Sequence, residues 1–119
     1  MDYKPELRSE PRVPVDFHGE LILEDSSMPC AIQNMCSRGF LIKYTKDLPH
    51  YRDLPVGQVL RLRCELFPAK TLECTVEVRH INAACFGARV IQMSEEGKRL
   101  CLQFLEEQSV ANLKIIPQR

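Results

Sequence analysis

The sequence predicts an all-β domain: a six-stranded antiparallel β-barrel, closed or nearly closed, followed by a C-terminal α-helix. Three observations lead to this prediction. Short runs in which apolar and polar residues alternate recur along the 119 residues. Brief turn-forming segments separate these runs, as they do in small barrels. The last apolar run changes to a spacing of three to four residues, which is typical of a helix.

The first three strands are expected in the N-terminal part of the chain, where residues of alternating polarity indicate one buried face. The expected elements are strands at 15–23, 30–34 and 39–44, with a turn at 25–27. If the first hairpin turns around Ser26 and Ser27, Gly39 lies opposite Pro14 across the ladder. The segments that precede the first strand and follow the second then meet at one end of the sheet.

The next two strands follow the same alternation, and a third strand comes after a turn. The expected elements are a loop at 49–56, strands at 60–66 and 72–78 joined by a break at 67–70, and a turn at 82–84 before a strand at 85–92. His80 continues the inward face of its strand in this pattern, so we interpret it as a core or rim residue.

Ser94 is a candidate helix N-cap, and the acidic residues that follow it favour the positive end of the helix dipole. An apolar stripe then predicts the face that covers one side of the barrel. The stripe consists of Leu100, Cys101, Phe104 and Leu105. From Gln108 onward we expect a short second helix or a loose tail. The chain thus divides into a flexible N-terminal arm at 1–6, a domain at 7–108 and a C-terminal tail at 109–119.

Composition limits the possible functions. The chain carries 16 basic and 16 acidic residues, so its formal net charge is zero. A general DNA or RNA binder needs excess positive charge, so neither partner is expected. No apolar run is long enough to cross a membrane, so membrane insertion is not expected either. No signal peptide is recognisable at the N-terminus, which favours a cytoplasmic protein.

Six cysteines raise the question of a metal site or a disulfide. None forms a C-x-x-C pair, whereas zinc sites usually show such close ligand pairs. Most of the cysteines occupy apolar positions in strand patterns, where thiols pack as small hydrophobic groups. We therefore expect reduced thiols and no metal ion or cofactor.

Two short segments carry the candidate chemistry. Arg8 and Arg12 lie just ahead of the first strand and offer two planar, permanently charged groups to an anionic ligand. The segment from Asn34 to Gly39 offers a side-chain amide and a glycine that a ligand can approach closely. The expected hairpin brings Arg12 and this segment together. A pocket of this kind suits phosphate and the edge of a purine base.

Each segment also has a purely structural reading. Arg8 and Arg12 could pair with neighbouring glutamates on a solvated arm. Asn34 and Gly39 could be turn residues, since both tolerate a left-handed backbone. Arg38 and Arg79 could add positive potential to the pocket or lie on a solvated strand face.

The two segments resemble the signatures of the PilZ domain, a bacterial receptor module for cyclic di-GMP. These signatures are R-x-x-x-R and [D/N]-x-S-x-x-G; here they read Arg8 to Arg12 and Asn34 to Gly39. The strand after the first signature and the later strands 76–79 and 86–94 are also similar to the family. The resemblance spans about residues 7–108 and implies a six-stranded barrel with a C-terminal helix.

The resemblance implies a role for each signature residue. Arg8 and Arg12 would bind phosphates and guanine edges, with the N-terminal arm closing over the ligand. Asn34 would hydrogen-bond a guanine or hold the loop that does. Gly39 would let the ligand approach the backbone.

Three positions qualify this picture. Cys36 stands where the signature has serine, and a thiol is a much weaker hydrogen-bonding group than a hydroxyl. Ser37 beside it would point to the opposite face if the backbone is extended. Leu7 precedes the first arginine and cannot donate to a second nucleotide, so we expect one ligand per chain. Together with Arg38, these residues complete the predicted site.

The resemblance implies a stand-alone cytoplasmic receptor that binds cyclic di-GMP and relays the signal to an effector protein that the sequence does not identify. The alternative is a PilZ-fold interaction module that does not bind nucleotide and acts in pilus assembly or motility. A cysteine-dependent enzyme is a third class, but no orienting residue for a Cys–His pair stands at a recognisable spacing. We do not expect an enzyme.

Overall fold

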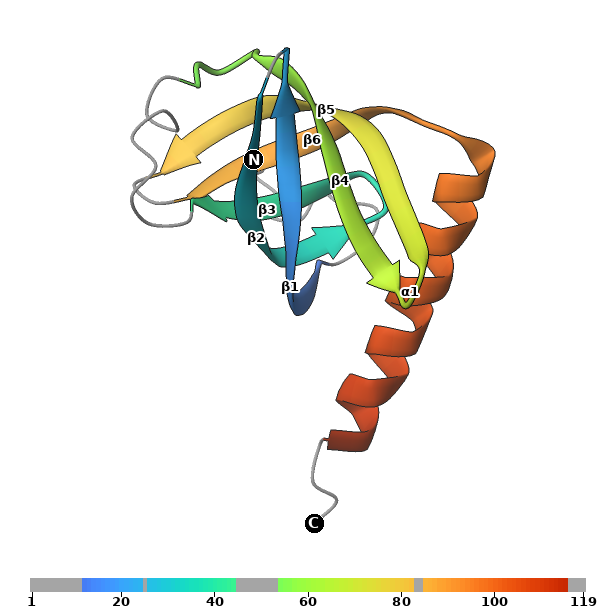
Figure 1. The fold of residues 1–119 in the computed structure, drawn as a ribbon. Coiled ribbons are helices and arrows are strands. Elements are labelled where there is room, and N and C mark those ends of the chain that lie inside the picture. Colours follow the sequence, from blue (N-terminus) through green and yellow to red (C-terminus); the bar gives the residue numbers. More distant parts are fainter. Residues whose placement is uncertain (1–11, 25, 45–53, 83–84, 116–119) are drawn as a thin grey trace, which may run out of the picture.

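The chain folds as a closed antiparallel barrel with one long helix beside it (Figure 1). The computed structural model describes residues 12–24, 26–44, 54–82 and 85–115. The elements are β1 (Val13–Leu23), β2 (Ser26–Cys36), β3 (Gly39–Tyr44), β4 (Val59–Phe67), β5 (Lys70–Asn82), β6 (Cys85–Met93) and α1 (Glu95–Ile115). The strands run in the order β1-β2-β3-β6-β5-β4 around the barrel, and β4 closes onto β1. The predicted fold is confirmed.

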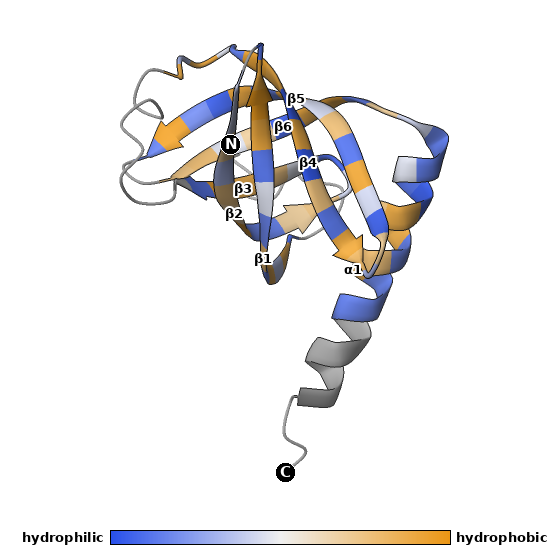
Figure 2. Cartoon of the chain, viewed as in Figure 1, coloured by the Kyte–Doolittle hydropathy of each residue, from blue (hydrophilic) through white to orange (hydrophobic). Residues whose placement is uncertain are grey.

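Alternating polarity along the strands produces the inside and the outside of the barrel (Figure 2). In β4 every second residue from Leu60 to Leu66 is buried, and the residues between them are exposed. The largest fully buried side chains include Phe40 and Phe86, which come from the neighbouring strands β3 and β6. No polar or charged residue of the described part of the chain is buried. Burial of apolar side chains is therefore the main force that closes the barrel.

The first hairpin turns earlier than its sequence predicts. Leu23 pairs with Ser26, so Ser26 and Ser27 belong to β2 and the predicted turn at 25–27 is wrong. Pro14 consequently lies opposite Asn34, and not opposite Gly39. Serine at the exposed start of a strand has the composition of a turn, and the alternation alone does not distinguish the two.

The helix begins as predicted. The backbone N–H of Gly97 donates to Ser94 Oγ at 3.0 Å, and the N–H of Lys98 donates to the Ser94 carbonyl at 2.9 Å. The predicted apolar stripe is buried against the barrel. Within it, the ring of Phe104 meets Phe17 edge-on, with centroids 5.5 Å apart, and Phe67 at 5.7 Å. These contacts fix α1 to the side of the barrel.

The helix does not end near Gln108. It continues to Ile115, so the expected second helix or loose tail is wrong for this stretch, and its last turns extend past the barrel (Figure 1). No glycine or proline interrupts the chain between Lys98 and Ile115. Without such a residue there is no local reason for the helix to stop. Among the described residues, no helix is long and apolar enough to cross a membrane.

Candidate functional site

The site begins with a contact between the two predicted segments. Arg12 precedes β1, and Asn34 lies in β2 opposite Pro14. The Nη1 group of Arg12 donates a hydrogen bond to Asn34 Oδ1 at 3.2 Å. The expected juxtaposition is present, although the expected register is wrong. The contact uses one donor of the guanidinium, which has five N–H groups in all. Leu7 and Arg8 lie outside the described residues.

A pocket of about 550 Å³ opens beside this contact. It is large enough for a small-molecule ligand. Four of the described lining residues are arginines, and none is an aspartate or a glutamate. The lining consists of Arg12, Cys36, Arg38, Gly39, Arg79, His80, Gly87, Ala88, Arg89 and Val90. A locally cationic pocket therefore exists on a chain whose overall charge is zero.

Two glycines on neighbouring strands form part of the pocket wall. Gly39 in β3 pairs with Arg89, and Gly87 in β6 pairs with Leu41. A Cβ atom added to Gly39 would lie only 2.5 Å from the carbonyl oxygen of Ala88. Glycine is thus required here by the approach of β6, independently of any ligand.

The turn between β2 and β3 is anchored to β6 and carries the remaining signature residues. The N–H of Val90 donates to the carbonyl of Arg38 at 2.7 Å. Cys36 is 5% exposed and still contributes to the lining of the pocket. Ser37 is half-buried and is not among the lining residues, whereas Arg38 is exposed and lines the pocket.

Sequence reasoning did not place five of the lining residues in the site. These are His80, Gly87, Ala88, Arg89 and Val90. Of the two positions expected for His80, the core is wrong and the rim agrees with the structure. The side chain is exposed and does not continue the inward face, because the pairing of β5 with β6 shifts between Val78 and His80. The others come from β6, which pairs with β3 although two strands separate them in the chain. The alternation of polar and apolar residues along a strand reveals neither a β-bulge nor a neighbouring strand that is distant in the sequence.

The cysteines belong mainly to the core. None of the six forms a disulfide, and five of them are buried. Burial raises the pKa of the Cys30 and Cys74 thiols to about 12, and it raises the pKa of the Cys64 thiol as well. A thiol with a raised pKa stays protonated at neutral pH and is a poor nucleophile. Within the described ranges, no group of three histidine, cysteine or acidic residues is arranged to hold a metal ion.

The fold and the pocket together define a small closed β-barrel with an arginine-rich pocket on its surface. The family model of the PilZ domain matches residues 6–107, and the chain belongs to this family. No curated protein matches the chain significantly.

Solved structures share the fold. The PilZ domain of YcgR from Escherichia coli, in a structure with cyclic di-GMP, has a TM-score of 0.73 at 11% identity; the match covers 93% of this chain and all of that one. The Bacillus subtilis inhibitor of motility MotI (DgrA) has a TM-score of 0.73 at 14% identity over 89% of this chain. The match covers 52% of MotI, so this chain spans about half its length.

The PilZ domain of CeSA from a cellulose-synthesizing bacterium has a TM-score of 0.65 at 8% identity, covering 84% of this chain and 99% of that one. At identities this low, the likeness shows a common fold.

Proposed function

We propose that this protein is a receptor for cyclic di-GMP that relays the second messenger to a partner protein. The observation that carries the proposal is the gathering of Arg12, Arg38, Arg79 and Arg89 around one pocket whose described lining has no acidic residue. Guanidinium groups match phosphate oxygens and guanine edges with paired hydrogen bonds. The YcgR structure with cyclic di-GMP supports this choice of ligand, because its PilZ domain has the same fold.

Each signature residue has a role in this proposal. Arg12 directs its remaining donors at the ligand while Asn34 holds it in place. Arg8 and Leu7 belong to an arm that closes over the ligand, which changes the surface that a partner protein meets. With Leu7 ahead of Arg8, one ligand binds per chain. The free thiols suit the reducing cytoplasm.

Calorimetric titration of the full chain with cyclic di-GMP tests the proposal. We expect saturable binding, and we expect the nucleotide to be recovered intact, because a receptor does not consume its ligand. Absence of heat and of any thermal stabilisation at millimolar nucleotide would contradict it. Saturation at two ligands per chain would contradict the proposal that one ligand binds per chain, and it would indicate that Arg38 or Arg79 contacts the second ligand.

The second candidate is an interaction module that does not bind nucleotide, in motility or pilus assembly. One observation favours it: Cys36, at the signature's serine position, is buried and offers only a weak hydrogen-bonding group. The likeness to the inhibitor of motility MotI fits this candidate too. The same titration separates the two, because the module would show no nucleotide binding.

A further inference from the structure

A β-bulge turns one aromatic side chain of β5 onto the pocket. Val78 pairs with Ala88 and His80 pairs with Gly87, so Arg79 is an extra residue of β5 between two residues whose partners are consecutive in β6. Before the bulge, the even-numbered side chain of Val78 is fully buried in the barrel. After it, the side chain of His80 is exposed and lines the pocket. Bulges next to functional sites commonly redirect a side chain in this way.

The glycine opposite His80 provides the space that the ring occupies. A Cβ atom added to Gly87 would lie 2.5 Å from both Cε1 and Nε2 of His80. The Cε1–Nε2 edge of the ring therefore occupies the place that a side chain of Gly87 would take. An aromatic ring over a cross-strand glycine is a favourable arrangement in sheets. The ring is thus positioned before any ligand arrives, and binding need not order it.

The arginines of the pocket differ from the His80 ring in shape and chemistry. Arg12, Arg38, Arg79 and Arg89 carry permanent positive charge and suit phosphate oxygens. Among the described residues that line the pocket, His80 alone carries an aromatic ring. Flat nucleobases stack on such rings, and the gain is largely independent of base sequence.

We propose that His80, seated on Gly87, is the residue on which a purine base of the ligand stacks, and that the arginines bind the phosphates. This inference rests on the proposed function, since it assigns a subsite within the same pocket. His80 would determine how firmly the base is held, and Gly87 would be a positioning residue that acts through the ring.

Titration of the full chain with cyclic di-GMP tests the ring. We expect His80→Ala to raise the Kd about tenfold or more, the scale of a lost stacking platform. His80→Phe keeps a flat ring and should bind within about threefold of the wild type. His18→Ala is the matched control, because His18 is an exposed strand histidine outside this pocket, and its Kd should match the wild type.

The outcomes separate this inference from the proposed function. If the wild type binds and His80→Ala binds equally well, His80 only covers the glycine, and the stacking role is overturned while the receptor stands. If His80→Phe is as weak as His80→Ala, stacking is overturned as well. A wild type that does not bind cyclic di-GMP overturns both proposals.

A double-mutant cycle tests whether Gly87 positions the ring of His80. Gly87→Ala forces the ring away, so it should weaken binding severalfold in the wild-type background. In the His80→Ala background, the same substitution should change the Kd by less than about twofold, because no ring remains to be moved. Equal losses in both backgrounds would show that Gly87 acts on the ligand directly, which overturns its positioning role. Melting temperatures of all variants without ligand identify any that fail to fold.

Discussion

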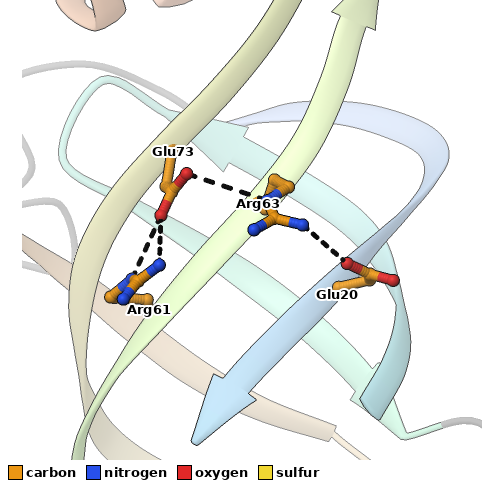
Figure 3. A network of polar contacts seen from close by, with 4 residues as sticks. All are labelled: Glu20, Arg61, Arg63 and Glu73. Atoms are coloured by element: carbon orange, nitrogen blue, oxygen red, sulfur yellow. Dashed lines mark hydrogen bonds and ion pairs between the residues drawn. The ribbon is translucent and has the colours of Figure 1, made fainter. Parts of the chain in front are cut away.

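Two sets of arginines on the barrel surface lie in opposite electrostatic surroundings. On the outer face of β1, β4 and β5, two arginines alternate with two glutamates across three neighbouring strands (Figure 3). Arg61 binds Glu73 through Nη2 at 2.7 Å and Nε at 3.1 Å. Arg63 reaches Glu20 at 3.3 Å and Glu73 at 3.7 Å. In the pocket, four arginines line one cavity with no acidic residue in its described lining.

The difference shows how a chain without net charge presents a strong local field. The first set is neutralised by its neighbours, and exposed pairs of this kind contribute little to stability. The second set keeps its positive potential available to an anion. Arg12 has its described hydrogen bond with a neutral amide, and no ion pair of Arg12 is formed with an acidic residue of the described part of the chain. Arg79 is intermediate, because Glu77 lies 3.7 Å away.

The largest effect should come from Arg12→Ala. It removes a charge-assisted contact with the ligand, so we expect the free energy of cyclic di-GMP binding to weaken by ~1.5–3 kcal/mol. Loss of the bond to Asn34 should lower the free energy of unfolding by less than about 1 kcal/mol. Calorimetric titration and denaturant unfolding measure the two quantities.

Arg61→Ala is the matched control for that substitution. It removes an arginine whose charge is already paired with Glu73, outside the pocket. Its Kd for cyclic di-GMP should equal that of the wild type. Equal losses in both variants would mean that overall charge, and not the pocket, determines affinity. Wild-type affinity in Arg12→Ala would remove Arg12 from the site.

Gly39→Ala should have the next largest effect, and it acts first on the fold. The added Cβ would meet the carbonyl of Ala88 at 2.5 Å, so β3 and β6 must move apart. We expect a loss of about 1–3 kcal/mol in unfolding free energy, together with weaker ligand binding because the pocket wall shifts.

Gly57→Ala provides the comparison for Gly39→Ala. Gly57 has φ of +98° and no atom within 4 Å of an added Cβ, so the cost there is backbone strain of about 1–2 kcal/mol. Gly57 does not line the pocket, so affinity should not change. A Gly39→Ala variant with wild-type stability would show that the two strands have room to relax.

The sequence predicted those features that depend on local pattern. Alternation and the turns between apolar runs identified all six strands, and Ser94 was recognised as the helix cap from its own chemistry. The contact between Arg12 and Asn34 was foreseen because both flank one hairpin. His80 and Arg89 were missed because their positions depend on a bulge and on the pairing of β6 with β3. Both are set by closure of the whole barrel and leave no local signal.

Cys36→Ser should have a smaller effect that divides between stability and binding. Cys36 is buried and also lines the pocket. The new hydroxyl would therefore be desolvated in the folded protein, and it could also form a hydrogen bond with the ligand. We expect the free energy of unfolding without ligand to fall by about 1–2 kcal/mol, because a buried hydroxyl needs a hydrogen-bond partner. The melting temperature should fall with it. Affinity should hold or improve, since a hydroxyl is the better hydrogen-bonding group. Weaker binding at unchanged stability would contradict both expectations.

The smallest effect should come from the paired set itself. Glu73→Gln keeps the shape of the side chain but removes the charge that faces Arg61 and Arg63. Because Arg61 and Glu73 are about half exposed, we expect a loss of no more than about 1 kcal/mol in unfolding free energy. This loss should vanish in 1 M salt, since screening removes the same interaction from the wild type.

The ligand affinity of Glu73→Gln sharpens the comparison between the two sets. At physiological salt, charges separated by more than about 8 Å interact weakly through solvent. In this variant Arg61 loses its acidic partner while Arg63 keeps Glu20, and we expect this change outside the pocket to leave ligand binding unaffected. Titration of Glu73→Gln at physiological salt should therefore give the wild-type Kd, and titration at low salt serves as the comparison. A Kd at physiological salt that is several-fold lower than the wild-type value would show that the glutamates on this face reduce the field of the pocket. The two sets would then be one electrostatic system, and the neutral chain would regulate its ligand affinity through charges on both faces.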